Sequence, residues 1–98
     1  MPDLASDKLM NRDLNLDVRS FILQEFPLAR KQQIKDSDRL LESGILDSQG
    51  VLEVVAFIEQ EFSITVVDDD LVTENFQTID RIAGFIAGKT KARNPGAA

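Results

Sequence analysis

The stretch LLESGILDSQGVLE, residues 40–53, is the most informative part of this sequence about its fold. An apolar pair leads to Gly44, two more apolar residues follow, and Asp47-Ser48 opens a predicted helix. Both residue types are favoured at helix N-termini, because their side-chain oxygens accept hydrogen bonds from amides that lack a partner within the helix. Gly44 permits a sharp turn, a positive φ included. The stretch therefore predicts a serine hydroxyl at the exposed, electropositive end of a helix dipole, which is a favourable position for a phosphate group.

The helix that begins at Ser48 is predicted to run to about Phe62. One broad side of it is apolar and can face a core; it carries Val51, Val54, Val55, Ile58 and Phe62. Leu52 lies at the margin, one turn beyond Ser48, and a helix that buries one face does not normally leave so much apolar surface elsewhere. The alternative is a helix packed on two sides within a small bundle. We interpret the margin as a surface for partner proteins, consisting of Gln49, Leu52, Glu53, Ala56, Glu59 and Gln60.

Two further long helices follow from apolar residues at helical spacing. The first is predicted from about Asp13 to Phe26, and Pro27 ends it because proline has no backbone N–H and disfavours helix at the preceding residue. The last begins after Thr78, a suitable N-cap. It is expected to end near Gly88, with basic residues at the negative pole of its dipole.

The segments between these helices predict little regular structure. Residues 27–47 form a long connection with one helical turn at residues 28–33, and its buried anchors are Ile34, Leu40, Leu41, Ile45 and Leu46. Residues 63–67 alternate as a strand does, but without a second strand they are interpreted as an extended connection. Residues 68–70 predict an N-capped short helix that continues or restarts through Phe76. The predicted fold is all-α, a small four-helix bundle of three longer helices and one short helix.

The composition excludes several classes of function. The 98 residues suffice for one domain with a modest core. The chain contains no cysteine and no histidine, so it lacks a thiol nucleophile, the commonest general base and the commonest neutral metal ligand. Asp36 and Asp38 lack the spacing of an EF-hand loop, and the three aspartates at 68–70 are interpreted as caps and solvated charge. We therefore predict no catalytic residue, no metal and no enzymatic activity.

Charge is distributed unevenly along the chain. Residues 1–39 contain seven basic and seven acidic residues, residues 40–80 contain ten acidic and no basic residues, and residues 81–98 contain four basic and no acidic residues. An acidic block of this kind repels nucleic acids and membrane surfaces and attracts basic protein partners. The sequence also lacks an apolar run of membrane-spanning length and a signal-peptide core. We expect a cytoplasmic monomer that binds neither nucleic acid nor membrane.

The motif GILDS at residues 44–48, followed by an apolar and acidic helix that ends in EQEF at residues 59–62, resembles the acyl carrier and peptidyl carrier proteins. The resemblance covers about Leu14 to Ala87. In that family the serine of an Asp-Ser motif is esterified with 4′-phosphopantetheine, whose thiol carries acyl or aminoacyl groups. The resemblance implies attachment at Ser48 and a role for Asp47 in recognition by a phosphopantetheinyl transferase. We place the carrier domain at residues 13–88; the composition on either side predicts a weakly ordered lead-in at 1–12 and a disordered basic tail at 89–98.

The implied function is that of an acyl carrier protein, which presents thioesters to partner enzymes in lipid, including fatty acid, or secondary-metabolite biosynthesis. Loading ligases and synthases with basic docking patches are the implied partners, and Glu53 and Glu59 match acidic docking positions of the family. Gln49, Gly50 and Gln60 depart from the pattern of fatty-acid carriers, and the pattern GILDS-x-G at residues 44–50 looks closer to that of dedicated, stand-alone carriers. Two alternatives follow: an aminoacyl carrier of the D-alanyl type, and an acidic helical protein-interaction module whose Ser48 is never modified.

Overall fold

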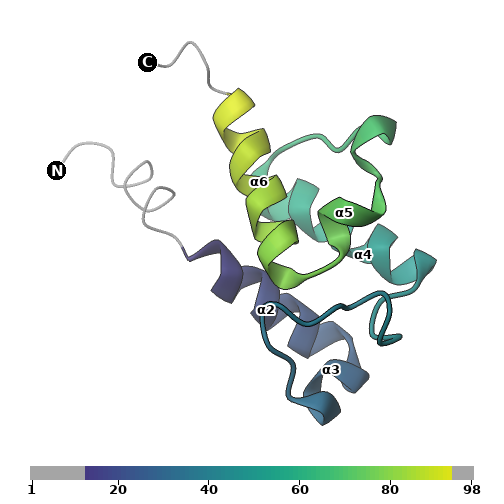
Figure 1. Cartoon of the computed structure of the whole chain (residues 1–98). Helices are drawn as coiled ribbons and strands as arrows, with labels where there is room; N and C mark the ends of the chain where they lie inside the picture. The colour runs from purple at the N-terminus through teal and green to yellow at the C-terminus, as the bar shows by residue number, and fades with distance from the viewer. Residues whose placement is uncertain (1–12, 94–98) are drawn as a thin grey trace, which may run out of the picture.

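The computed structural model describes residues 13–93, and the predictions for residues 1–12 and 94–98 lie outside this range. Figure 1 shows helices joined by irregular connections. In chain order the elements are α2 (Leu14–Glu25), α3 (Pro27–Gln32), α4 (Ser48–Phe62), the 3-10 turn η1 (Asp68–Asp70), α5 (Thr73–Phe76) and α6 (Ile79–Arg93). Within residues 13–93 there is no strand, and residues 63–67 form a connection without regular structure that begins with Ser63 in the left-handed conformation. The predicted all-α fold, a small helical bundle, is confirmed.

Side-chain caps set the beginnings of the first and last helices, and the cap at Thr78 was predicted. Asp13 is the N-cap of α2 and accepts a hydrogen bond through Oδ1 from the amide of Leu16, at 3.1 Å. Thr78 precedes α6, and its Oγ1 accepts from the amide of Arg81 at 3.0 Å. These bonds satisfy amides that have no partner within the helix. Pro27 opens α3 directly after α2, since proline at the first helical position loses no hydrogen bond.

One apolar core joins the helices. α2 packs most extensively against α6, and α5 also packs against α6. Two rings extend the core between α2 and α4, where Phe21 and Phe57 stack with their centroids 4.2 Å apart. The members of the core with 1% exposure or less are Val18, Ile22, Ala29, Ile34, Leu40, Val54, Ile58, Ile79, Ile82 and Ile86. Burial of this set is the main stabilising contribution to the fold.

The long connection between α3 and α4 is fixed by polar contacts as well as by its apolar anchors. The Arg19 guanidinium donates to Asp36 Oδ1 at 2.9 Å and to the Ile34 carbonyl at 2.6 Å. The Asp36 carbonyl in turn accepts from the amide of Asp80, at the start of α6. The Leu40 amide donates to the Gln77 carbonyl at 2.8 Å. Contacts from α2 and from the beginning of α6 therefore determine where the connection delivers α4.

The prediction that the last helix ends near Gly88 is wrong, because α6 continues to Arg93. Gly88 does not have the positive φ of a helix-ending glycine; Gly44 is the glycine with a positive φ among the described residues. A glycine within an exposed helix costs only about 1 kcal/mol relative to alanine. The helix past Gly88 is also held from outside, since Lys89 forms an ion pair with Asp70 of η1 at 2.8 Å.

Candidate functional site

The turn before α4 has the geometry that the sequence predicts. Gly44 adopts φ +84°, a left-handed conformation that glycine enters without steric cost. Its amide donates to the Leu41 carbonyl at 3.3 Å, and the Leu46 amide donates to the Leu40 carbonyl at 3.0 Å. Ile45 and Leu46 are buried directly after the turn. The turn and these anchors therefore fix the position at which α4 begins.

Asp47 and Ser48 have different roles at the start of α4. Asp47 is the N-cap, and its Oδ1 accepts a hydrogen bond from the amide of Gly50 at 2.7 Å. Ser48 is the first helical residue and is exposed. Among residues 13–93 no hydrogen bond engages its side chain. Because Asp47 provides the cap, the Ser48 hydroxyl remains accessible at the positive end of a helix of 15 residues.

Gly50 has a packing role that the sequence interpretation missed. It is buried, and a Cβ at this position would lie 3.1 Å from Leu46 Cδ2 and 3.1 Å from Phe26 Cε1. A signal for this role is present in the sequence. Gly50 precedes Val54, Ile58 and Phe62 at intervals of four residues, and these are the other buried residues of α4. The glycine therefore lets α4 approach the end of α2 closely, beneath the exposed serine.

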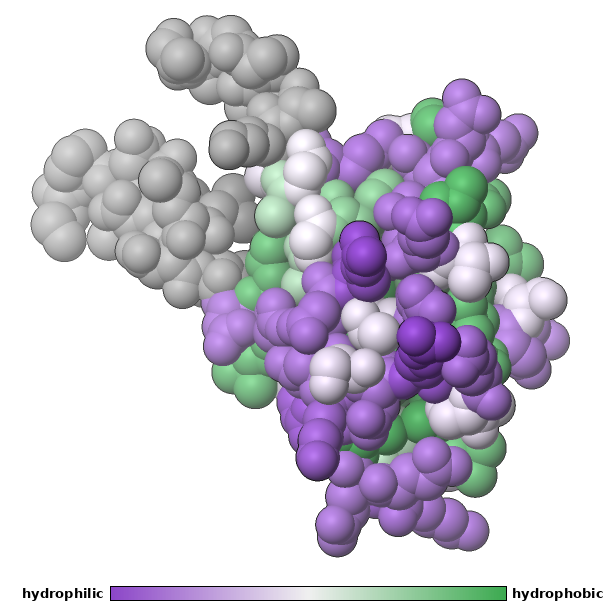
Figure 2. All heavy atoms as spheres, viewed as in Figure 1, coloured by the Kyte–Doolittle hydropathy of each residue, from purple (hydrophilic) through white to green (hydrophobic). Residues whose placement is uncertain are grey.

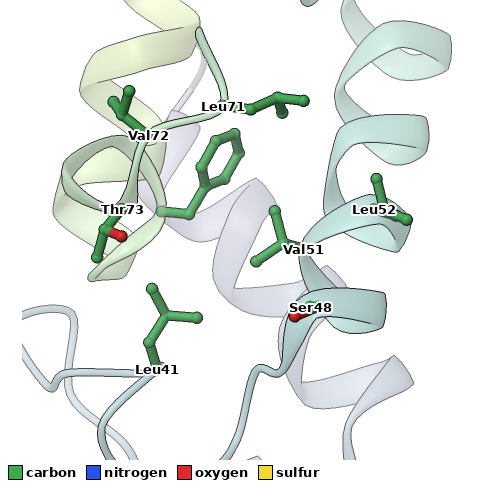
Figure 3. A pocket seen from close by; sticks show the side chains of 8 residues that line it. Leu41, Ser48, Val51, Leu52, Leu71, Val72 and Thr73 are labelled. Carbon is green, nitrogen blue, oxygen red and sulfur yellow. The ribbon is translucent and has the colours of Figure 1, made fainter. Parts of the chain in front are cut away.

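An open groove of about 280 Å³ lies beside Ser48. Figure 3 shows Ser48 and Val51 of α4 on one side, Val72 and Thr73 across from them, and Leu41 below. The complete lining is Leu41, Ser48, Val51, Leu52, Leu71, Val72, Thr73 and Phe76. Leu52 is 60% exposed, as its predicted place at the margin of the helix requires. The contribution of Leu71 and Val72 was not predicted, because the sequence does not show which segment lies opposite α4.

The six residues predicted to contact partners do not share one environment. Gln49, Leu52, Glu53, Ala56 and Gln60 are exposed on α4. Glu59 is half-buried, and its Oε2 accepts a hydrogen bond from the Val66 amide at 2.9 Å. The stack of Phe57 on Phe21 shows that α4 is also packed on a second side. The alternative of a helix packed on two sides therefore applies to the part of α4 around Phe57, and the docking role of the exposed residues stays a prediction.

Polar residues cover most of the face shown in Figure 2, and apolar residues reach the surface mainly toward the side where α4 and α5 lie. Among the exposed apolar residues, Leu52, Val67, Leu71 and Val72 belong to α4 and to the segment between α4 and α5. Acidic residues Asp68, Asp69 and Glu74 are exposed in the same region. Within the described part of the chain, no group of three potential ligands is placed to hold a metal ion, and no helix is long and apolar enough to cross a membrane.

The family model for the phosphopantetheine attachment site matches residues 13–86. This range contains every element that the structure describes except the end of α6. The chain therefore belongs to the phosphopantetheine-attachment family, whose members bind 4′-phosphopantetheine covalently on a serine. It is a carrier protein, and the chemistry of the reactions that it serves is performed by partner enzymes.

Two curated proteins of known class are similar to this chain over most of its length. The chain is 34% identical over 70 residues to the D-alanyl carrier protein of Streptococcus suis (strain 98HAH33), a match that covers 68% of this chain and 87% of that protein. It is 28% identical over 81 residues to the D-alanyl carrier protein of Streptococcus mutans serotype c, covering 81% of this chain and 99% of that protein. Both of these relatives are D-alanyl carrier proteins.

Proposed function

We propose that Ser48 is the attachment serine and that this protein carries an aminoacyl group, of the D-alanyl class, as a thioester on 4′-phosphopantetheine. The observation that carries the proposal is the exposed Ser48 hydroxyl, which Asp47 frees from capping. The curated D-alanyl carrier proteins support the choice of cargo. Gln49, Gly50 and Gln60, which depart from the pattern of fatty-acid carriers, support the same choice.

The chain's own residues suit the attachment reaction. The Ser48 oxygen attacks the β-phosphorus of coenzyme A, the bond from this phosphorus to the 3′,5′-ADP leaving group breaks, and the serine proton passes to a base of the transferase. The resulting phosphodiester is an anion at the N-terminus of α4, where the helix dipole favours negative charge. When bound, the prosthetic group supplies the thiol that this cysteine-free chain lacks.

The surface around Ser48 provides the other requirements of a carrier. The apolar groove borders the attachment oxygen and offers the arm a partly sheltered surface. Glu53 and Leu52 are exposed on α4 close to the attachment point, and they form the core of the proposed docking surface for the transferase and the loading ligase. Acidic residues steer enzymes that have basic docking patches, and a single exposed leucine provides apolar contact.

The test is an intact mass measurement after incubation with coenzyme A and a broad-specificity phosphopantetheinyl transferase. We expect one phosphopantetheine adduct on the wild type and none on Ser48→Ala, with the thermal unfolding midpoint unchanged because Asp47, not Ser48, caps α4. A folded wild type that gains no adduct with two different transferases would favour the unmodified interaction module.

The cargo is tested on the modified protein. A D-alanine-activating ligase is offered D-alanine, L-alanine and a fatty acid in parallel, and loading is read as a second mass increment that hydroxylamine removes. We expect D-alanyl thioester formation. Loading by an acyl-activating ligase with the fatty acid, and no loading with either alanine, would restore the fatty-acid alternative.

A further inference from the structure

The far wall of the groove beside Ser48 belongs to the short segment that joins α4 to α5. It leaves the end of α4 after Phe62, passes through η1 and reaches the groove at Leu71 and Val72. These two side chains are 43% and 48% exposed, so burial of their own apolar surface fixes them only weakly. Ile64, near the start of the segment, is buried in the core, so the position of η1 and of the wall depends on this anchor and on the polar contacts of the segment.

Charged side chains of α4 and α6 hold the segment at two points. From α4, Glu59 accepts the hydrogen bond of the Val66 amide at 2.9 Å. From α6, the Lys89 ammonium contacts Asp70 Oδ2 at 2.8 Å, with the two side chains 28% and 20% exposed. Because of this partial burial, the second contact is screened less by solvent than a fully exposed ion pair.

Asp70 connects Lys89 to the backbone of the wall. Its Oδ2 also accepts from the Val67 amide at 3.0 Å, and its carbonyl accepts from the Asn75 side chain at 2.8 Å and from the Val72 amide at 2.9 Å. The hydrogen bond from Lys89, followed by that from Val67, lowers the pKa of the Asp70 carboxyl, in agreement with this geometry. A shift of Asp70 therefore moves the backbone that carries Leu71 and Val72.

We propose that Lys89 is a positioning residue: through its ion pair with Asp70 it holds Leu71 and Val72 opposite Ser48, and it thereby sets the shape of the groove in which the prosthetic arm and its cargo lie. The part of this inference that concerns the arm rests on the proposed function. Besides packing against α5, the last helix acts on this far wall through the ion pair of Lys89 with Asp70.

The first experiment uses the unmodified protein and does not depend on the proposed function. Amide hydrogen exchange at Leu71 and Val72 is compared in wild type, Lys89→Gln, Lys89→Arg and Arg81→Gln. Arg81 is an exposed cation of the same helix, so its variant makes the same change in charge without removing the ion pair. We expect exchange about tenfold faster in Lys89→Gln only, with Lys89→Arg near wild type. Equal rates in Lys89→Gln and Arg81→Gln would overturn the proposal.

The second experiment uses the arm itself. Because the chain has no cysteine, the phosphopantetheine thiol is its one thiol and takes a single trifluoromethyl label, which is observed by fluorine NMR far below the unfolding temperature. We expect wild type, Lys89→Arg and Arg81→Gln to share one chemical shift. In Lys89→Gln and Asp70→Asn the signal should move toward that of labelled pantetheine free in solution, and the double variant should move it no further.

The outcomes separate the two hypotheses. A wild type that takes up no label contradicts the proposed attachment at Ser48, while the hydrogen-exchange result still decides the role of Lys89. A labelled arm with the same chemical shift in wild type and Lys89→Gln overturns the effect of Lys89 on the groove, whatever the cargo.

Discussion

At the scale of single residues, the site depends on a division of roles among three residues at the start of α4. Asp47 caps α4, Ser48 remains exposed, and Gly50 lies buried one turn below Asp47. The amide of Gly50 donates to Asp47, and the missing side chain of Gly50 makes room for Phe26 and Leu46. The accessible hydroxyl and the close packing beneath it therefore depend on neighbouring residues of different chemistry.

Two glycine-to-alanine variants test the packing role of Gly50. Gly84 lies exposed in α6, where an added Cβ would have no atom within 4 Å, so Gly84→Ala should raise the free energy of unfolding by about 0.5–1 kcal/mol through helix propensity. Gly50→Ala receives the same benefit but crowds two core side chains, which costs about 1–3 kcal/mol. In urea unfolding, the free energy of unfolding of Gly50→Ala should be equal to or lower than that of wild type. An increase as large as that of Gly84→Ala would contradict the packing role of Gly50.

At the scale of elements, α4 serves the core, the groove and the proposed docking surface with different faces. Its buried residues follow each other at intervals of four, while Leu52 and Glu53 remain exposed between them. Glu59 differs from the other acidic residue of the proposed surface, since its carboxylate is already bound to the backbone that follows the helix. We therefore expect Glu59 to stabilise the connection and Glu53 to contact partners.

Variants at Glu59 and Glu53 separate these roles. Glu59→Gln keeps a carbonyl oxygen for the Val66 amide, whereas Glu59→Ala leaves that amide without its acceptor, so alanine should lower the free energy of unfolding by about 1 kcal/mol more than glutamine. Glu53→Gln and Glu53→Ala should not differ in urea unfolding. The KM of the transferase should rise more for Glu53→Gln than for Glu59→Gln. The reverse order would indicate that Glu59, rather than Glu53, contacts the transferase.

At the scale of the whole molecule, a few ion pairs join segments that are far apart in the sequence. Arg19 ties the long connection to α2 through Asp36, and Lys89 ties η1 to α6 through Asp70. The hydrogen bond from Lys89, then that from the Val67 amide, holds the pKa of Asp70 below its ordinary value. The charged form of this one carboxyl is thus linked to the tertiary structure.

This linkage predicts how the stability depends on pH. Because the pKa of Asp70 is lower in the folded state than in the unfolded state, its contribution is complete above the ordinary pKa of 3.8 and is lost as pH falls through the folded pKa. Urea unfolding of wild type and Asp70→Asn should therefore differ most near pH 6, and the difference should shrink below pH 4. A difference that stays constant from pH 6 to pH 2 would contradict the linkage.

The three long helices, the turn at Gly44 and the exposed serine at the start of α4 could all be predicted from the amino-acid sequence. Each of these depends on contacts between residues that are close in the chain: apolar residues at helical spacing, side chains that cap the next turn, and the freedom of glycine to adopt a positive φ. The sequence also predicts an N-cap at Asp47 or Ser48. Local rules alone do not decide which of these two adjacent residues is the cap, and in the structure it is Asp47.

Only the tertiary structure shows which segment faces Ser48 across the groove, why glycine is favoured at position 50, and that Glu59 accepts a hydrogen bond from the Val66 amide. Tertiary contacts also stabilise α6 beyond Gly88, because Lys89 forms an ion pair with Asp70 there. These features depend on which elements pack together, and the same glycine or charged residue is favourable or unfavourable according to the partner that packing brings to it.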